Sequence, residues 1–160
     1  MSADAPSRRA AWLRAKLFHG YFLLSRPMTL GVRGLVHDRE TRSVFLIRHT
    51  YVPGWQLPGG GVETGETMQE ALEREVREEG NIELDAPQLR SIHLNRQASR
   101  RDHVAFYLIE SFRRLGPKLP DREIAESGFF PLDALPRETT PATRRRIAEV
   151  FEGVPPSPYW

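Results

Sequence analysis

Residues 58–82 read PGGGVETGETMQEALEREVREEGNI, and this stretch decides the fold. Its consecutive glycines form a loop whose backbone is free to adopt positive φ angles. Thr67, followed three residues later by Glu70, is a capping box that starts a helix. Gly80-Asn81 supplies two residues that tolerate the left-handed conformation typical of helix ends. The stretch therefore predicts a glycine-rich loop followed by a helix over residues 67–79.

The predicted helix carries acidic residues on the face that should pack inward. That face is defined by four apolar residues, Met68, Ala71, Leu72 and Val76. Glu75 and Glu79 fall in the same sector at about 100° per residue, and Glu78 lies at its edge. Carboxylates crowded there repel one another and lose hydration. Oxygen ligands at this spacing suit Mg²⁺ or Mn²⁺, whereas ion pairing with Arg or Lys elsewhere in the fold is the alternative.

The same stretch resembles the Nudix box in every spacing. The matching residues are Gly60, Glu66, Arg74-Glu75-Val76, Glu78-Glu79 and Ile82. Asn81 stands where the box has its final glycine, and asparagine also tolerates positive φ. The resemblance covers about residues 29–151 and implies a Nudix-type α/β/α sandwich with a mixed β-sheet.

The resemblance also implies roles for the residues of the box. Glu75, Glu78 and Glu79 would bind the metal, the Gly60 carbonyl would add a ligand, and Glu66 with Arg74 would brace the loop against the helix. The implied reaction is attack of water on phosphorus in a nucleoside diphosphate derivative or nucleoside triphosphate. The metal screens charge on the phosphate oxygens and acidifies the water.

The base that accepts the proton from water stays open at this point. It is one of the box glutamates or an acid of the later segment 121–126, where Glu123 and Glu126 are the candidates. Each of these two is also well explained as a solvated loop acid.

Six residues are candidates for binding the substrate, namely Arg48, Tyr51, Trp55, Arg96, Arg100 and Arg101. The arginines of the polar loop 95–103 offer donors for phosphate, although a plain solvated loop explains them equally well. Tyr51 and Trp55 flank Pro53-Gly54 and could stack on a base, whereas packing is the ordinary role of such residues.

Two other functions compete with hydrolysis of a small nucleotide. The first is an RNA 5′-end pyrophosphohydrolase, and the second is a non-catalytic Nudix-like module that senses nucleotides. The complete acidic set argues against the sensor. Because the chain beyond residue 30 is slightly acidic, binding of long nucleic acid is not expected.

The remaining sequence indicates one catalytic domain with a short extension at each end. We expect an amphipathic helical arm in residues 1–28, the Nudix domain in 29–153 and a proline-rich irregular tail in 154–160. Further helices are expected at 10–24 and 140–151, and strands at 29–36, 42–49, 89–94 and 104–109. The arm is basic, through Arg8, Arg9, Arg14, Lys16 and Arg26.

The arm and the composition also indicate where the protein works. A homodimer formed through the arm or a helix docked on its own domain explains the arm better than membrane attachment, which is unlikely from the sequence. The chain contains no cysteine, and its beginning does not resemble a signal peptide, so we expect a cytoplasmic protein.

Overall fold

The computed structural model describes residues 8–160, and residues 1–7 of the expected arm lie outside this range. In chain order the elements are α1 (Arg8–Ser25), β1 (Thr29–Asp38), β2 (Ser43–His49), β3 (Trp55–Gln56), α2 (Met68–Gly80), β4 (Ile82–Asp85), β5 (Gln88–Leu94), β6 (Asp102–Ile109), β7 (Ser111–Arg114), β8 (Ile124–Pro131) and α3 (Pro141–Phe151). Among the described helices, none is both long enough and apolar enough to cross a membrane.

The main sheet is mixed, as expected. Its strand order is β3-β2-β1-β6-β5, and β8 pairs with β2. The pairing of β1 with β6 is parallel from Thr29↔Asp102 to Val36↔Ile109, while the other pairings are antiparallel. β1 and β2, both expected as strands, form a hairpin through the antiparallel pairs His37↔Val44 and Asp38↔Ser43.

A second, two-stranded sheet of β4 and β7 was not expected from the sequence. Both strands have only four residues, and β7 is mostly exposed and shows no alternation of apolar and polar residues. Their pairing joins residues as far apart in the sequence as Ile82 and Arg114. Short segments of this kind become strands only when tertiary structure places a partner beside them.

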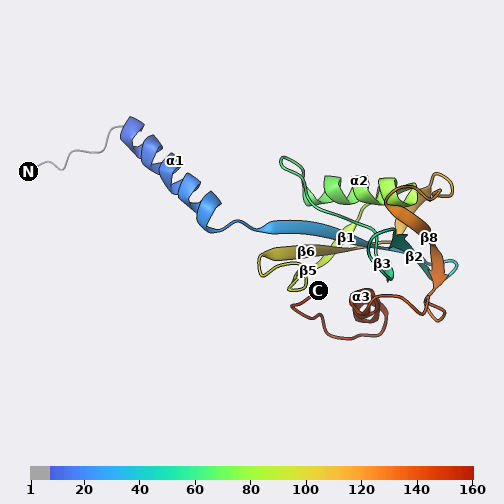
Figure 1. The fold of residues 1–160 in the computed structure, drawn as a ribbon. Helices are drawn as coiled ribbons and strands as arrows, with labels where there is room; N and C mark the ends of the chain where they lie inside the picture. The colour runs from blue at the N-terminus through green and yellow to red at the C-terminus, as the bar shows by residue number, and fades with distance from the viewer. Residues whose placement is uncertain (1–7) are drawn as a thin grey trace, which may run out of the picture.

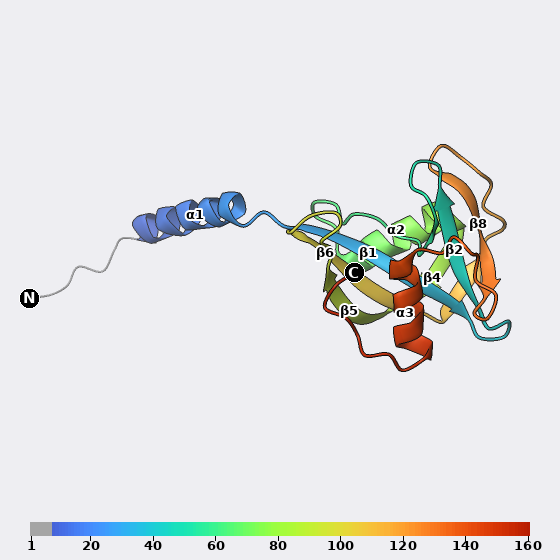
Figure 2. The same cartoon turned by 60° about the horizontal axis from the view of Figure 1, so that its bottom comes forward.

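Helices α2 and α3 cover opposite faces of the main sheet, so the expected sandwich is confirmed (Figure 1). On one face, Ala71, Leu72 and Val76 of α2 are fully buried against strand residues such as Ile47. On the other face, Ile147 of α3 packs into a second core cluster. Helix α1 stands clear of this body in both views (Figures 1 and 2).

The C-terminal tail is irregular, as expected, but it is held firmly against the edge of the sheet at β5. Leu94 donates its N–H to the Pro158 carbonyl at 2.9 Å, and Trp160 donates to the Leu94 carbonyl at 3.2 Å. The Trp160 ring packs edge-on against Phe106 in the second core cluster. The tail therefore covers part of an otherwise open strand edge.

Candidate functional site

Helix α2 carries the acidic residues of the site, and both of its ends are capped as the sequence predicts. Thr67 accepts a hydrogen bond from the Glu70 N–H at 3.2 Å, and the Glu70 carboxylate accepts from the Thr67 N–H at 2.8 Å. At the other end Asn81 adopts the left-handed conformation with φ 51°, and its N–H donates to the Arg77 carbonyl. Asn81 thus ends the helix in the left-handed conformation that a glycine at this position of the box would adopt.

The glycine-rich loop lies pressed between β1 and α2. The Gly60 carbonyl accepts a hydrogen bond from Val32 of β1 at 2.8 Å. A Cβ atom on Gly59 would lie 2.1 Å from the Val32 carbonyl oxygen, and one on Gly60 would lie 2.2 Å from a carboxylate oxygen of Glu75. Only glycines allow this close approach, which brings the loop backbone directly beside the Glu75 carboxylate.

Arg74 ties the loop to the helix, in line with the bracing role implied for it. Its guanidinium donates to both oxygens of Glu66, at 2.9 and 3.0 Å, and to the Gly61 carbonyl at 3.1 Å. It also donates to Glu75 at 2.7 Å. These charge-assisted bonds hold both the loop and the Glu75 carboxylate in place.

Glu79 is the most deeply buried acid of the box, with 6% of the residue exposed. One oxygen accepts a hydrogen bond from the Gly59 N–H at 2.7 Å, and the other lies 3.7 Å from Nε2 of His49. Burial raises the pKa of Glu79 to about 7, against the opposing effects of the Gly59 hydrogen bond and the Arg33 charge. Arg33 itself is held by donating to the Leu57 and Gly59 carbonyls.

The three glutamates line one cleft of about 510 Å³ together with the loop that precedes β8. The loop residues facing them are Lys118, Asp121, Arg122, Glu123 and Ile124. Glu123, a candidate base, thus lies in the same cleft as the box acids. Glu126 does not line this cleft, because on β8 it pairs with Arg48 of the adjacent strand β2.

The chemistry of the cleft fits a divalent cation that prefers oxygen ligands. Glu75, Glu78 and Glu79 present carboxylates to the cleft. Glu79 is buried, and the positive charge near it does not offset its loss of hydration, so a bound cation would stabilise its charged form. Within residues 8–160, however, no three acidic or imidazole groups converge as a ready metal cluster. Instead, Nη1 of Arg74 lies 2.7 Å from the Glu75 carboxylate and 3.7 Å from the Glu78 carboxylate, so one guanidinium pairs with both.

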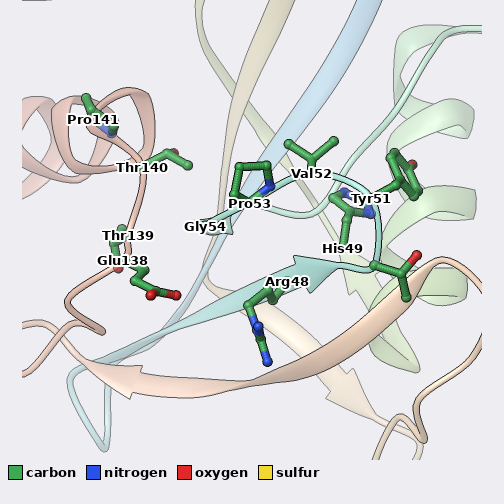
Figure 3. Close-up of a pocket in the computed structure, with 11 residues that line it drawn as sticks. Arg48, His49, Tyr51, Val52, Pro53, Gly54, Glu138, Thr139, Thr140 and Pro141 are labelled. Atoms are coloured by element: carbon green, nitrogen blue, oxygen red, sulfur yellow. The ribbon is translucent and has the colours of Figure 1, made fainter.

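A second cleft, of about 670 Å³, is shown in Figure 3. The loop after β2 forms one wall and the residues before α3 form the other. His49 lines this cleft, and its Nε2 lies 3.7 Å from a carboxylate oxygen of Glu79, which lines the first cleft, so the two clefts are neighbours. The walls are joined at Trp55, which donates its N–H to the Glu138 carbonyl and accepts from the Thr140 N–H, both at 3.0 Å.

Two of the predicted substrate-binding residues, Arg48 and Tyr51, line the second cleft. The Tyr51 ring is exposed and lies 5.1 Å from the His49 ring, in a tilted arrangement. Trp55 does not line the cleft. Its ring is buried edge-on against Phe130, 4.7 Å away, so it packs in the core and is not placed to stack on a base.

The predicted arginine loop lies at the other end of β1 from the hairpin turn. Thr29, the first residue of β1, donates its N–H to the Arg101 carbonyl at 3.1 Å. Arg96 lies 3.9 Å above the Tyr159 ring of the tail. Neither Arg100 nor Arg101 is among the residues that line the two clefts.

Several residues of the site carried no recognisable signal in the sequence. They are Arg33, His49, Lys118, Arg122 and Glu138. Each is a polar residue in a strand or loop outside the box, and no local spacing relates it to the acidic residues of α2. Only His49, as a polar residue ending a strand of apolar residues, could have attracted attention before the fold was known.

Comparison with known proteins agrees with this geometry. The family model described as NUDIX domain matches residues 27–151. A crystal structure of a MutT NUDIX hydrolase from Burkholderia pseudomallei is 27% identical, with a TM-score of 0.66, and the match covers 76% of this chain and 97% of that one.

Two curated relatives are similar over shorter stretches. An RNA pyrophosphohydrolase from Xanthomonas campestris pv. campestris (strain B100) is 50% identical over 49 residues, which are 31% of this chain and 24% of that protein. The nucleoside triphosphatase NudI of Enterobacter sp. (strain 638) is 71% identical over 28 residues, which are 17% of this chain and 20% of that protein. The chain thus matches only about a quarter of the length of these relatives. The family match, in contrast, spans most of the chain and contains both the sheet and the acidic helix, so the protein belongs to the NUDIX family.

Proposed function

We propose that the protein is a pyrophosphohydrolase that cleaves the phosphoanhydride of a small nucleotide, either a nucleoside diphosphate derivative or a nucleoside triphosphate. The observation that carries this proposal is the close approach, at 3.7 Å, of His49 in the second cleft to Glu79 in the acidic cleft. One cleft offers carboxylates for metal and phosphate chemistry, and the other offers a bounded space with an exposed aromatic ring. A nucleotide needs both kinds of surroundings side by side.

In this proposal the nucleoside occupies the second cleft. The Tyr51 ring stacks on the base. Glu138 supplies a carboxylate that accepts hydrogen bonds from hydroxyl or amino groups. The phosphates then extend past His49 to the acidic cleft.

The acidic cleft supplies the groups that act on the phosphates. Glu75, Glu78 and Glu79 would hold Mg²⁺ or Mn²⁺, which screens the phosphate charge and acidifies the attacking water. Lys118 and Arg122, at the rim of the cleft, bind phosphate oxygens. Glu123 is the acid of the later segment that lines this cleft, and we assign it as the base that accepts the proton from water.

The names of the relatives support two substrate classes. The NudI relative is a nucleoside triphosphatase, and the Xanthomonas relative is an RNA pyrophosphohydrolase. A small nucleotide fits this chain better, because the nucleoside cleft has two walls and the domain beyond the arm is not basic. Cleavage of an RNA 5′-end is the second candidate. The cysteine-free sequence and a nucleotide substrate support a cytoplasmic location.

The test is a screen of nucleoside triphosphates, nucleotide sugars, dinucleotides and triphosphorylated RNA, with Mg²⁺ or Mn²⁺ and with product analysis by chromatography. We expect cleavage of at least one small nucleotide. Glu78→Gln should lower kcat by about 100-fold or more, because Glu78 faces the cleft yet is mostly exposed and its loss should leave the fold intact. Glu73→Gln, on the same helix but outside the acidic cleft, is the control.

Two results would contradict the proposal. Cleavage of triphosphorylated RNA alone would favour the second candidate. Inactivity on every substrate, together with tight binding of one nucleotide, would favour the sensing module.

A further inference from the structure

Helix α1 presents large apolar side chains that nothing in the described structure covers. Leu17, Tyr21 and Leu24 follow one another at four- and three-residue steps and are 67%, 64% and 85% exposed. Trp12 and Phe18 are also more than half exposed. The helix stands clear of the domain in both views (Figures 1 and 2). A run of exposed apolar residues this dense marks an interaction surface.

The charge of the same segment restricts what can cover it. Residues 8–28 contain Arg8, Arg9, Arg14, Lys16 and Arg26 and no acidic residue. Two copies of this helix packed together would bring like charges close to each other, which opposes self-association. A negatively charged surface with an apolar interior meets both requirements of the helix.

A second group of positive charges lies at the end of the domain from which the helix departs. The loop of residues 95–103 contains Arg96, Arg100 and Arg101 and one acidic residue, Asp102, whose carboxylate accepts hydrogen bonds from Thr29 and Asn95. It adjoins the start of β1, because Thr29 donates its N–H to the Arg101 carbonyl. Arg100 and Arg101 are exposed. The positive loop and the positive helix therefore lie at one end of the molecule.

We propose that this end binds an anionic phospholipid surface. Helix α1 lies in the plane of the interface, with Leu17, Tyr21 and Leu24 in the boundary between headgroups and acyl chains. Trp and Tyr side chains favour this depth because one end of each ring is polar. Arg100 and Arg101 make a second, electrostatic contact with the headgroups.

The attachment leaves both clefts free, because neither is lined by residues of α1 or of the arginine loop. The proposed attachment therefore concerns the location of the protein in the cell, and it does not depend on the proposed hydrolysis. It also departs from the expectation drawn from the sequence alone. A homodimer formed through the arm or a helix docked on its own domain was expected there, and in the structure the helix does not dock on its domain.

RNA is a less suitable partner for this end of the molecule. Arginine and lysine would bind its phosphates, but the aliphatic side chains of Leu17 and Leu24 would gain nothing from such contacts. Only a surface that is negatively charged and also accepts apolar side chains accounts for both the charge and the exposed apolar residues of the helix.

The test is flotation of the full chain with vesicles of phosphatidylcholine alone or mixed with phosphatidylglycerol. We expect binding only to the anionic vesicles, and weaker binding at high salt. The double substitution Leu17→Ser and Leu24→Ser should weaken binding by about tenfold or more. Leu119→Ser is the matched control, because Leu119 is equally exposed, at 74%, but lies in the loop before β8.

Tryptophan emission provides a second readout that does not depend on flotation. Trp55 and Trp160 pack in the core, whereas Trp12 is exposed but lies about 140° around the helix from Leu17. With Trp12→Phe and Tyr21→Trp combined, the exposed tryptophan lies on the inserted face, so its emission should shift to the blue on addition of anionic vesicles. Arg100→Gln with Arg101→Gln should weaken flotation by about fivefold without altering the fold by circular dichroism.

Three outcomes would overturn the proposal. The first is absence of flotation with anionic vesicles. The second is a dimer by light scattering that the Leu17 and Leu24 substitutions convert to a monomer. The third is binding of single-stranded RNA, measured by fluorescence anisotropy, that outcompetes the vesicles.

Discussion

At the scale of single residues, burial decides the chemistry of Glu79. The position of this residue on the inward face of α2 follows from the periodicity of the helix, and its low exposure confirms that prediction. The side chain is stabilised by a backbone N–H from Gly59, while Arg33 donates to backbone carbonyls instead. Burial removes the hydration of this carboxylate, and its nearby hydrogen bond and positive charge only partly replace that hydration. The charged form is therefore disfavoured.

We predict that Glu79→Gln leaves the metal-free protein at least as stable as the parent. Glutamine keeps the shape of the side chain and an oxygen for the Gly59 N–H, and it removes a charge that burial and the nearby Glu75 disfavour. The parent should gain more in melting temperature on addition of Mg²⁺, because an amide is a poorer ligand for a hard cation.

Melting curves of both proteins, with Mg²⁺ and with a chelator, check this prediction. Glu73→Gln, outside the acidic cleft, should behave like the parent in both conditions. A large loss of stability of Glu79→Gln in the chelator would mean that Glu79 serves as a structural ion-pair partner.

At the scale of elements, the loop between β7 and β8 completes the acidic cleft. Its near end is tied to the end of α2, where Leu115 donates to the Asn81 carbonyl at 2.8 Å and the Asn81 amide donates to the Pro117 carbonyl at 3.2 Å. Its far end is organised by Asp121, which pairs with Lys118. Backbone N–H groups and Lys118 hold the pKa of Asp121 well below its usual range.

We predict that Lys118→Met raises KM for the nucleotide by about tenfold, with a smaller effect on kcat. The physical reason is that a cation at the rim of the cleft holds phosphates in the ground state and in the transition state alike. Asp121→Asn should have the same effect in weaker form, because it loosens the loop that positions Lys118.

Steady-state kinetics with varied nucleotide concentration separate the two parameters. Arg113→Met, which removes a cation on β7 that pairs with Glu83 outside the cleft, should leave both unchanged. Equal kinetics of Lys118→Met and the parent would exclude Lys118 from phosphate binding.

At the scale of the whole molecule, a buried polar cluster fastens the C-terminal tail to the sheet. Arg146 of α3 is fully buried and pairs with Glu149. Its guanidinium also lies 2.6 Å from Nδ1 of His93 on β5, and the same Nδ1 lies 2.7 Å from the Ser157 carbonyl in the tail. One cluster thus joins a helix, a strand and the end of the chain.

This cluster predicts that His93 makes a contribution to stability that is lost in mild acid. Burial, and then the charge of Arg146, lower the pKa of His93 below its ordinary value of 6.5. The neutral ring is therefore favoured in the folded protein, and its contribution to stability is complete above about pH 6.5. As the pH falls below that value toward the lower folded pKa, the unfolded chain takes up protons first and stability is lost.

Thermal melts from about pH 8 to about pH 5 check the sign of this effect. His93→Gln should remove this contribution, so its stability relative to the parent should rise as the pH falls, whereas His19→Gln, on the exposed surface of α1, should keep a constant difference from the parent. The comparison is made with the parent because the raised pKa of Glu79 acts in the opposite direction over the same range and is present in all three proteins. A difference between the parent and His93→Gln that does not change with pH would contradict the assigned role of His93.

The sequence by itself determined the loop, the helix, its caps and the inward carboxylates. These features depend on residues a few positions apart, and the geometry of a helix converts such spacing directly into position in space. The α/β/α sandwich followed from the resemblance of the same stretch to the Nudix box.

Only the tertiary structure decided which distant residues join the box. Lys118 and Glu123 reach the acidic cleft because β7 and β8 place their connecting loop beside the end of α2. Trp55 is buried because α3 and its preceding segment close over that face. The arginine loop lines neither cleft, because the parallel pairing of β1 and β6 places it at the start of β1. These outcomes depend on the packing of segments tens of residues apart, and no local spacing encodes such packing.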